Sequence, residues 1–190
     1  MTDLLNVDWT AIPAPADDGG ARHLPGLTLP SVPLPATDGT TVDLSALASR
    51  TVVYAYPRTA LPGDDPERPD DWDMIPGARG CTPQACAFRD HHAELAALGV
   101  AQLFGLSTQS SDFQREAAAR LHLPFPLLSD ADLTLATALN LPLLDAAGMT
   151  LLKRLTMILR DGVVEHVFYP VFPPDRNAAD VIAWLSANPE

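Results

Sequence analysis

The chain has 190 residues, and its 24 acidic and 12 basic side chains give a formal net charge of −12 at pH 7. This length is enough for one compact domain with a substantial core, so we expect a single domain over residues 1–190. The basic residues occur one or two at a time and form no patch that could follow a phosphate backbone, which argues against a nucleic-acid partner.

The N-terminus carries no sustained apolar segment of the kind found in signal peptides, and no later apolar run approaches the ~18 residues needed to span a bilayer. We therefore expect no membrane partner and a cytoplasmic location. In that reducing compartment a pair of cysteines is more often catalytic, redox-sensing or metal-binding than a permanent disulfide.

The chain begins with an expected extended lead-in at residues 1–24, because repeated prolines there and just beyond prevent a helix from starting. Residues 27–29 and 32–34 are typical of edge strands, where proline is tolerated. The Asp-Gly pair at residues 38–39 predicts a tight turn.

A central strand is predicted next. Residues 41–44 lead into a short helical turn at residues 45–48, and the β-branched and aromatic run at residues 51–56 favours a buried strand that Pro57 ends. The following loop, residues 58–79, is almost devoid of apolar side chains before Trp72. Loops of this length are usually functional or disordered. We interpret it as an inserted active-site loop, held in place by Trp72 and Ile75, rather than a merely solvated insertion.

One helix is predicted after this loop, from near Cys81 to Leu98, with Gly99 as its C-terminal cap and Pro83 tolerated in the first turn. One face of the helix collects these side chains: Phe88, His91, His92, Leu95 and Leu98. Because the two histidines lie on or beside this apolar face, we expect them to be structural rather than metal ligands.

The only two cysteines, Cys81 and Cys86, lie at the start of this helix. The helical wheel directs Cys81 toward the protein body and Cys86 outward. Cysteines five residues apart in an intact helix have Cα atoms about 8 to 9 Å apart, beyond the roughly 7 Å limit for a disulfide, so a bond requires the first turns to unwind.

A thiol at a helix N-terminus faces the positive end of the helix dipole, which favours the thiolate and makes Cys81 the better nucleophile, with Arg79 adding to the effect. The alternatives are an inert buried pair or half of a metal site, although zinc normally takes four ligands.

The second half alternates strand and helix signals, which indicates an α/β fold with a central mixed sheet covered by helices on both faces. No internal repeat is present. The predicted elements are a strand at residues 100–107, a helix from its N-cap Ser111 to Leu121, an extended piece at residues 123–128, a helix at residues 133–139 after Ser129 and Asp130, a hairpin of residues 154–159 and 163–169, and a last helix at residues 178–187.

Residues 80–90 read GCTPQACAFRD, which resembles the G-C-T-x-x-x-C-x-F-R-D signature of the peroxiredoxin Q (bacterioferritin comigratory protein) family. Other segments in the family's order extend the resemblance over most of residues 25–188. It implies a thioredoxin-like fold of the peroxiredoxin type and a thiol peroxidase with Cys81 as the peroxidatic cysteine and Cys86 as the resolving cysteine. It also implies that Arg154 is the active-site arginine; the alternative is a surface ion pair beside Lys153.

The sequence departs from the family pattern before the first cysteine. The family motif is P-x-x-x-T-x-x-C, but Pro57 stands 24 residues before Cys81, and Ala78 occupies the threonine position. We favour Thr59 as the source of the missing hydroxyl. By the same resemblance, Pro57, Gly80 and Arg79 are expected to form the substrate-binding part of the site.

The expected function is therefore an antioxidant peroxidase that reduces hydrogen peroxide and organic hydroperoxides without a cofactor or metal. Cys81 would become a sulfenic acid, Cys86 would form an intramolecular disulfide with it, and thioredoxin or a similar dithiol would reduce that bond. The resemblance implies a monomer, since resolution needs no second chain. Two alternatives remain: a thiol-disulfide oxidoreductase on the same fold, which normally uses C-x-x-C, and a redox-responsive binding protein or sensor.

Overall fold

A five-stranded sheet forms the centre of the computed structural model, which describes residues 7–61 and 71–189. The strands of this sheet are β3 (Arg50–Ala55), β4 (Val100–Ser107), β5 (Leu127–Ser129), β8 (Leu155–Arg160) and β9 (Val163–Phe168). The strand order is β5-β4-β3-β8-β9; β3 pairs in parallel with β4 and antiparallel with β8. The buried run predicted at residues 51–56 is thus the middle strand, and the mixed sheet is confirmed.

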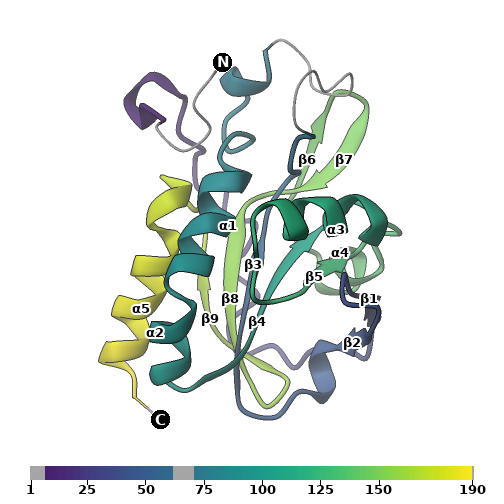
Figure 1. Ribbon diagram of the computed structural model, residues 1–190, viewed down its shortest axis with the longest axis vertical. Helices are drawn as coiled ribbons and strands as arrows, with labels where there is room; N and C mark the ends of the chain where they lie inside the picture. The colour runs from purple at the N-terminus through teal and green to yellow at the C-terminus, as the bar shows by residue number, and fades with distance from the viewer. Residues whose placement is uncertain (1–6, 62–70, 190) are drawn as a thin grey trace.

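Two separate cores cover the two faces of this sheet. Val53 and Ala55 of β3 face one core, whereas Val52 and Tyr54 face the other, as the two-residue period of a strand requires. The first core is closed by the lead-in and α4 (Thr134–Leu139). The second lies beneath α1 (Cys81–Asp90), α2 (His92–Ala97), α5 (Asn177–Ala187) and the end of α3 (Ser111–Arg120). Figure 1 shows α1, α2 and α5 side by side along the sheet.

The prediction of a single helix from Cys81 to Leu98 is wrong, because the structure has two helices there. They are separated at His91, whose φ of −97° and ψ of 7° end α1 and begin α2. The apolar pattern could not reveal the break, because Phe88 and Leu95 are seven residues apart and lie on the same side with or without it. Both histidines are partly exposed, and His91 Nδ1 lies 3.0 Å from the Glu94 carboxylate.

Two smaller hairpins and four short 3-10 helices complete the described part of the chain. The hairpins are β1 (Pro33–Pro35) with β2 (Thr41–Asp43), and β6 (Leu143–Ala146) with β7 (Met149–Leu152). The 3-10 helices are η1 (Trp9–Ala11), η2 (Leu44–Ala46), η3 (Trp72–Met74) and η4 (Pro174–Arg176). The β8–β9 hairpin and α5 were predicted, as was the turn at residues 38–39 that lies between β1 and β2, whereas the pairing of β1 with β2 and the strands β6 and β7 were not. The lead-in expected to be extended contains one turn of 3-10 helix, η1, where Asp8 accepts a hydrogen bond from the Thr10 N–H. Ser110, rather than Ser111, caps α3 by accepting a hydrogen bond from the Phe113 N–H.

The loop at residues 58–79 is described at its two ends only; the prediction for residues 62–70 falls outside the described residues. At its C-terminal end Trp72 is 5% exposed and packs with Ala78 and Leu151, and Ile75 packs against the same cluster. The predicted anchoring by Trp72 and Ile75 is confirmed. Within residues 7–61 and 71–189, no helix is long and apolar enough to cross a membrane.

Candidate active site

Cys81 is the first residue of α1 and is only 4% exposed. Gly80 precedes it as the N-cap with a φ of +108°, a left-handed conformation that glycine adopts without strain. The Cys81 thiol donates to the Ala78 carbonyl oxygen, with sulfur and oxygen 3.7 Å apart. This backbone geometry fixes the direction of the sulfur.

Arg154 is the charged partner of this thiol. Its Nη2 lies 3.2 Å from Cys81 Sγ, and the residue is 3% exposed. The same nitrogen is directed toward three consecutive carbonyl oxygens, those of Gly77, Ala78 and Arg79, at 3.3, 3.4 and 3.1 Å. Lys153 instead pairs with Asp18, its Nζ 2.6 Å from the carboxylate. Arg154 is therefore buried against the cysteine and is not a surface ion pair beside Lys153.

A network of buried, hydrogen-bonded polar side chains holds the guanidinium of Arg154 in place. Arg154 Nη1 donates to Gln84 Oε1. Gln84 Nε2 donates in turn to Asn177 Oδ1 at 2.9 Å, and the Thr156 hydroxyl donates to the same oxygen at 2.6 Å. Gln84, Asn177 and Thr156 are at most 1% exposed. Because a buried charge needs hydrogen-bonded partners, this network fixes the position of the guanidinium.

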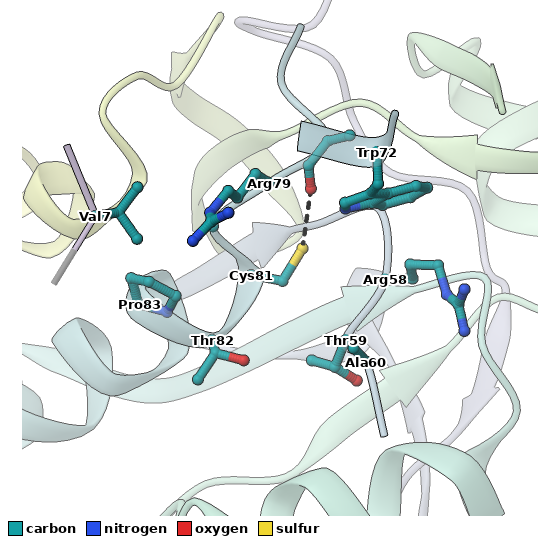
Figure 2. A pocket seen from close by; sticks show the side chains of 11 residues that line it. Val7, Arg58, Thr59, Ala60, Trp72, Arg79, Cys81, Thr82 and Pro83 are labelled. Atoms are coloured by element: carbon teal, nitrogen blue, oxygen red, sulfur yellow. Dashed lines mark hydrogen bonds between the residues drawn. The ribbon is translucent and has the colours of Figure 1, made fainter. Parts of the chain in front are cut away.

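A cavity of about 50 Å³ opens beside the Cys81 sulfur. Figure 2 shows Trp72 and Arg58 on one side of the sulfur and Pro83 and Val7 on the other. The full lining is Val7, Arg58, Thr59, Ala60, Trp72, Ala78, Arg79, Gly80, Cys81, Thr82 and Pro83. A cavity of this size holds a few water-sized molecules.

Thr59 lines this cavity but is bound to Gln109. Gln109 Oε1 accepts from the Thr59 N–H at 2.8 Å and from its hydroxyl at 3.2 Å, and Gln109 Nε2 donates to the Thr59 carbonyl at 3.0 Å. Within the part of the chain that the structure describes, no hydrogen bond joins Thr59 to Cys81. The hydroxyl still has lone pairs with which it can accept a hydrogen bond.

The other expected site residues occupy different positions. Gly80 and Arg79 line the cavity, and Arg79 forms an ion pair with Asp73 of the inserted loop. Pro57 is not part of the lining; it is buried immediately before the lining residue Arg58, and its carbonyl oxygen accepts a hydrogen bond from the Ser107 hydroxyl at 3.1 Å. No group of three or more possible ligands could hold a metal ion among the residues described.

Cys86 does not point outward as the helical wheel predicts. It is 7% exposed and packs in the core beneath α1 with Tyr54 and Phe88. The wheel assumes one covered face, but α1 is covered on a second side as well, where Arg89 Nη1 donates to the carbonyl oxygen of Leu121. Burial raises the pKa of the Cys86 thiol above its ordinary value, while the positive charge of Arg89 acts in the opposite direction. Both cysteines are free thiols.

The sequence matches the Redoxin family over residues 24–182. The chain belongs to this family. A peroxiredoxin Q from Sedum lineare is 32% identical over 169 residues, which cover 88% of this chain and 80% of that protein. The chain is therefore a member of the peroxiredoxin Q family. A peroxiredoxin Q from Oryza sativa subsp. japonica is 31% identical over 164 residues, 85% of this chain, and this chain spans 66% of its length. The crystal structure of peroxidoxin BcpB from Mycobacterium tuberculosis matches with a TM-score of 0.70 and 28% identity, covering 88% of this chain and all of that one.

This peroxiredoxin Q departs from the family motif at the position where the motif places a threonine hydroxyl. Ala78 stands there, and it contributes a backbone carbonyl that accepts from the Cys81 thiol. The candidate hydroxyl comes from Thr59, at the other end of the insertion and on the same cavity.

Sequence reasoning missed the residues that support this redoxin's site from a distance. Gln84 gave one signal, since a polar residue three positions after Cys81 lies on the same inward face of the helix. Asn177 gave none, because it is 93 residues away in the sequence. Gln109 also follows its strand without any pattern that connects it to Thr59.

Proposed function

We propose that this protein is a thiol peroxidase that reduces hydrogen peroxide and organic hydroperoxides through Cys81. The observation that carries the proposal is the 3.2 Å separation of Arg154 Nη2 and Cys81 Sγ beside a small cavity. A cationic donor at this distance stabilises a thiolate and can also polarise a bound peroxide. Membership of the peroxiredoxin Q family supports the same reaction class.

In the first step the Cys81 thiolate attacks one peroxide oxygen and the O–O bond breaks. The sulfur becomes a sulfenic acid, and the second oxygen leaves as water or an alcohol after taking up a proton. Arg154 donates to the thiolate and to the leaving oxygen. Thr59, with its hydroxyl hydrogen directed to Gln109, accepts from the peroxide O–H that is attacked. Gly80 and Arg79 line the place where the peroxide lies, and Pro57 supports the chain just before the lining residue Arg58.

In the second step Cys86 attacks the Cys81 sulfenic acid, giving an intramolecular disulfide and one water. A dithiol of the thioredoxin type then reduces this bond by exchange and returns both thiols. Because both cysteines belong to one helix, a monomer can complete the cycle, and the reducing conditions of the cytoplasm suit it.

Three variants test this scheme in a peroxide-consumption assay coupled to thioredoxin, thioredoxin reductase and NADPH. Cys81→Ser should abolish consumption. Cys86→Ser should react once and then accumulate sulfinic acid on Cys81, detected by intact mass. Arg154→Met should lower the rate of Cys81 oxidation by about 10² to 10³, the usual cost of losing one donor to a developing charge.

Sustained thioredoxin-coupled turnover by Cys86→Ser would remove the resolving role. Oxidation of the wild type by peroxide without multiple turnovers would favour a redox-responsive binding protein instead. A reduction assay with insulin separates the remaining alternative, a general disulfide reductase.

A further inference from the structure

The N-terminal segment Val7–Ala11 lies against the start of α1, although it precedes the region matched to the redoxin family. Trp9 is the residue that makes this contact. Its indole Nε1 donates to Asp175 Oδ2 of η4 at 2.8 Å, and its ring meets Phe172 edge to face with centroids 5.9 Å apart. Val7 reaches one wall of the Cys81 cavity.

Gly80 is the point at which this contact reaches the active site. A β-carbon at Gly80 would collide with Pro174 and would lie 2.9 Å from Trp9 Cη2. The N-cap of α1 is therefore enclosed between η4 and the indole. Gly80 also supplies the first carbonyl of the helix, which accepts from the Gln84 N–H at 3.0 Å.

The proposed reaction requires this helix start to come apart. In the intact α1 the two cysteines are held about 8 to 9 Å apart between Cα atoms, and a disulfide tolerates no more than roughly 7 Å. Both thiols are also buried. Contacts that hold the first turn closed must therefore break before Cys86 can reach Cys81.

We propose that Trp9 is a positioning residue that holds the start of α1 closed, favouring the reaction of Cys81 with peroxide and delaying its bond to Cys86. The proposal rests on the proposed peroxidase function. Trp9 touches neither sulfur. It acts through Gly80, Phe172 and Asp175, and it sets the lifetime of the sulfenic acid.

That lifetime has a chemical consequence. The sulfenic acid either condenses with the Cys86 thiol, losing water and closing the disulfide, or meets a second peroxide. In the second case the sulfur bonds to one peroxide oxygen, the O–O bond breaks, the other oxygen leaves as water or an alcohol, and Cys81 ends as a sulfinic acid. A closed helix start favours the second outcome at high peroxide. Trp9 should therefore make the enzyme sensitive to overoxidation.

The first test needs no enzymatic activity. Hydrogen exchange of the reduced full chain should show the amides of residues 81–86 exchanging faster in Trp9→Ala than in wild type, with α3 unchanged. Trp184→Ala is the matched control, because Trp184 is a partly buried tryptophan on α5 that stacks on His166. Equal exchange at residues 81–86 in wild type and Trp9→Ala would overturn the proposal.

The second test follows the sulfenic acid. After one equivalent of hydrogen peroxide and rapid acid quench, intact mass should show the disulfide of Trp9→Ala forming about tenfold faster, which corresponds to about 1.4 kcal/mol less stabilisation of the closed helix start. The peroxide concentration that leaves half of Cys81 as sulfinic acid should rise by the same factor. Trp9→Phe, which keeps a ring against Phe172, should lie between wild type and Trp9→Ala.

The outcomes separate this inference from the proposed function. A wild type that forms no sulfenic acid refutes the peroxidase itself. If the wild type forms the sulfenic acid but its disulfide forms as fast as that of Trp9→Ala, the role of Trp9 is refuted and the peroxidase proposal stands. If Trp184→Ala accelerates disulfide formation as much as Trp9→Ala, the effect is general destabilisation and the inference is wrong.

Discussion

Replacing Asn177 by alanine tests the buried polar network beneath Arg154. Asn177 Oδ1 accepts from two donors, Gln84 Nε2 at 2.9 Å and the Thr156 hydroxyl at 2.6 Å. Both donors belong to side chains that are 0% exposed. Asn177→Ala would leave both without this acceptor and would remove the anchor that positions Gln84 beneath the guanidinium.

The magnitude follows from counting the donors. A buried donor left without its acceptor costs about 1 to 3 kcal/mol, so two donors predict a loss of about 2 to 6 kcal/mol in the free energy of unfolding. Thr156→Val in the wild-type background removes one hydrogen bond and leaves the Gln84 bond intact, at a cost of about 1 kcal/mol. In the Asn177→Ala background the same change removes a stranded hydroxyl, and it should restore about 1 to 3 kcal/mol.

Urea denaturation of the four proteins in this double-mutant cycle measures the coupling. We expect a coupling energy of about 2 to 3 kcal/mol, the upper part of the range of about 0.5 to 3 kcal/mol found for side chains in one hydrogen-bond network. Asn177→Ala should also slow Cys81 oxidation by peroxide, whereas Thr156→Val should change that rate little. If Thr156→Val costs the same in both backgrounds, or Asn177→Ala costs less than about 1 kcal/mol, the network does not stabilise the site as reasoned.

Two further predictions follow from the ends of α1. Gly80→Ala places a β-carbon against Pro174 and Trp9 at a positive φ, and strain and overpacking together should cost at least about 2 kcal/mol in the free energy of unfolding; a urea midpoint equal to that of wild type would contradict the described packing. Burial raises the pKa of Cys86, so this thiol stays protonated at neutral pH. In the reduced protein its alkylation by iodoacetamide should keep accelerating as the pH rises above about 8.5, the ordinary pKa of a free cysteine. Peptide mass analysis that finds the Cys86 rate already constant below pH 8.5 would show that burial does not control this thiol.

The sequence was sufficient to predict those strands and turns that are determined by neighbouring residues. The β-branched run before Pro57 is the middle strand, and the Asp161–Gly162 pair forms the turn between β8 and β9, with φ of 50° and 73°. The turn between β6 and β7 uses the same left-handed conformation at Ala147 and Gly148, with φ of 53° and 72°. Alanine is rarely found in that conformation, so this hairpin left no clear signal.

The candidate site was predictable only in part, for a similar reason. The position of Cys81 at a helix start follows from its neighbours in the sequence. The burial of Cys86 does not, because it depends on a second covering layer that meets α1 near Leu121. The contact of Trp9 with Gly80 likewise joins segments that share no pattern, and only tertiary packing brings them together.

The central position of β3 has a consequence for the newly made protein. Both neighbours of this strand come later in the chain: Arg50 pairs with Val100 in β4 and with Arg160 in β8. At a synthesis rate of about 5 to 20 residues per second, the roughly 80 residues between Cys81 and the end of β8 take about 4 to 16 s to add. During those seconds the ribosome-bound chain carries both thiols without the sheet that later buries them. Neither thiol has its folded environment until that synthesis is complete.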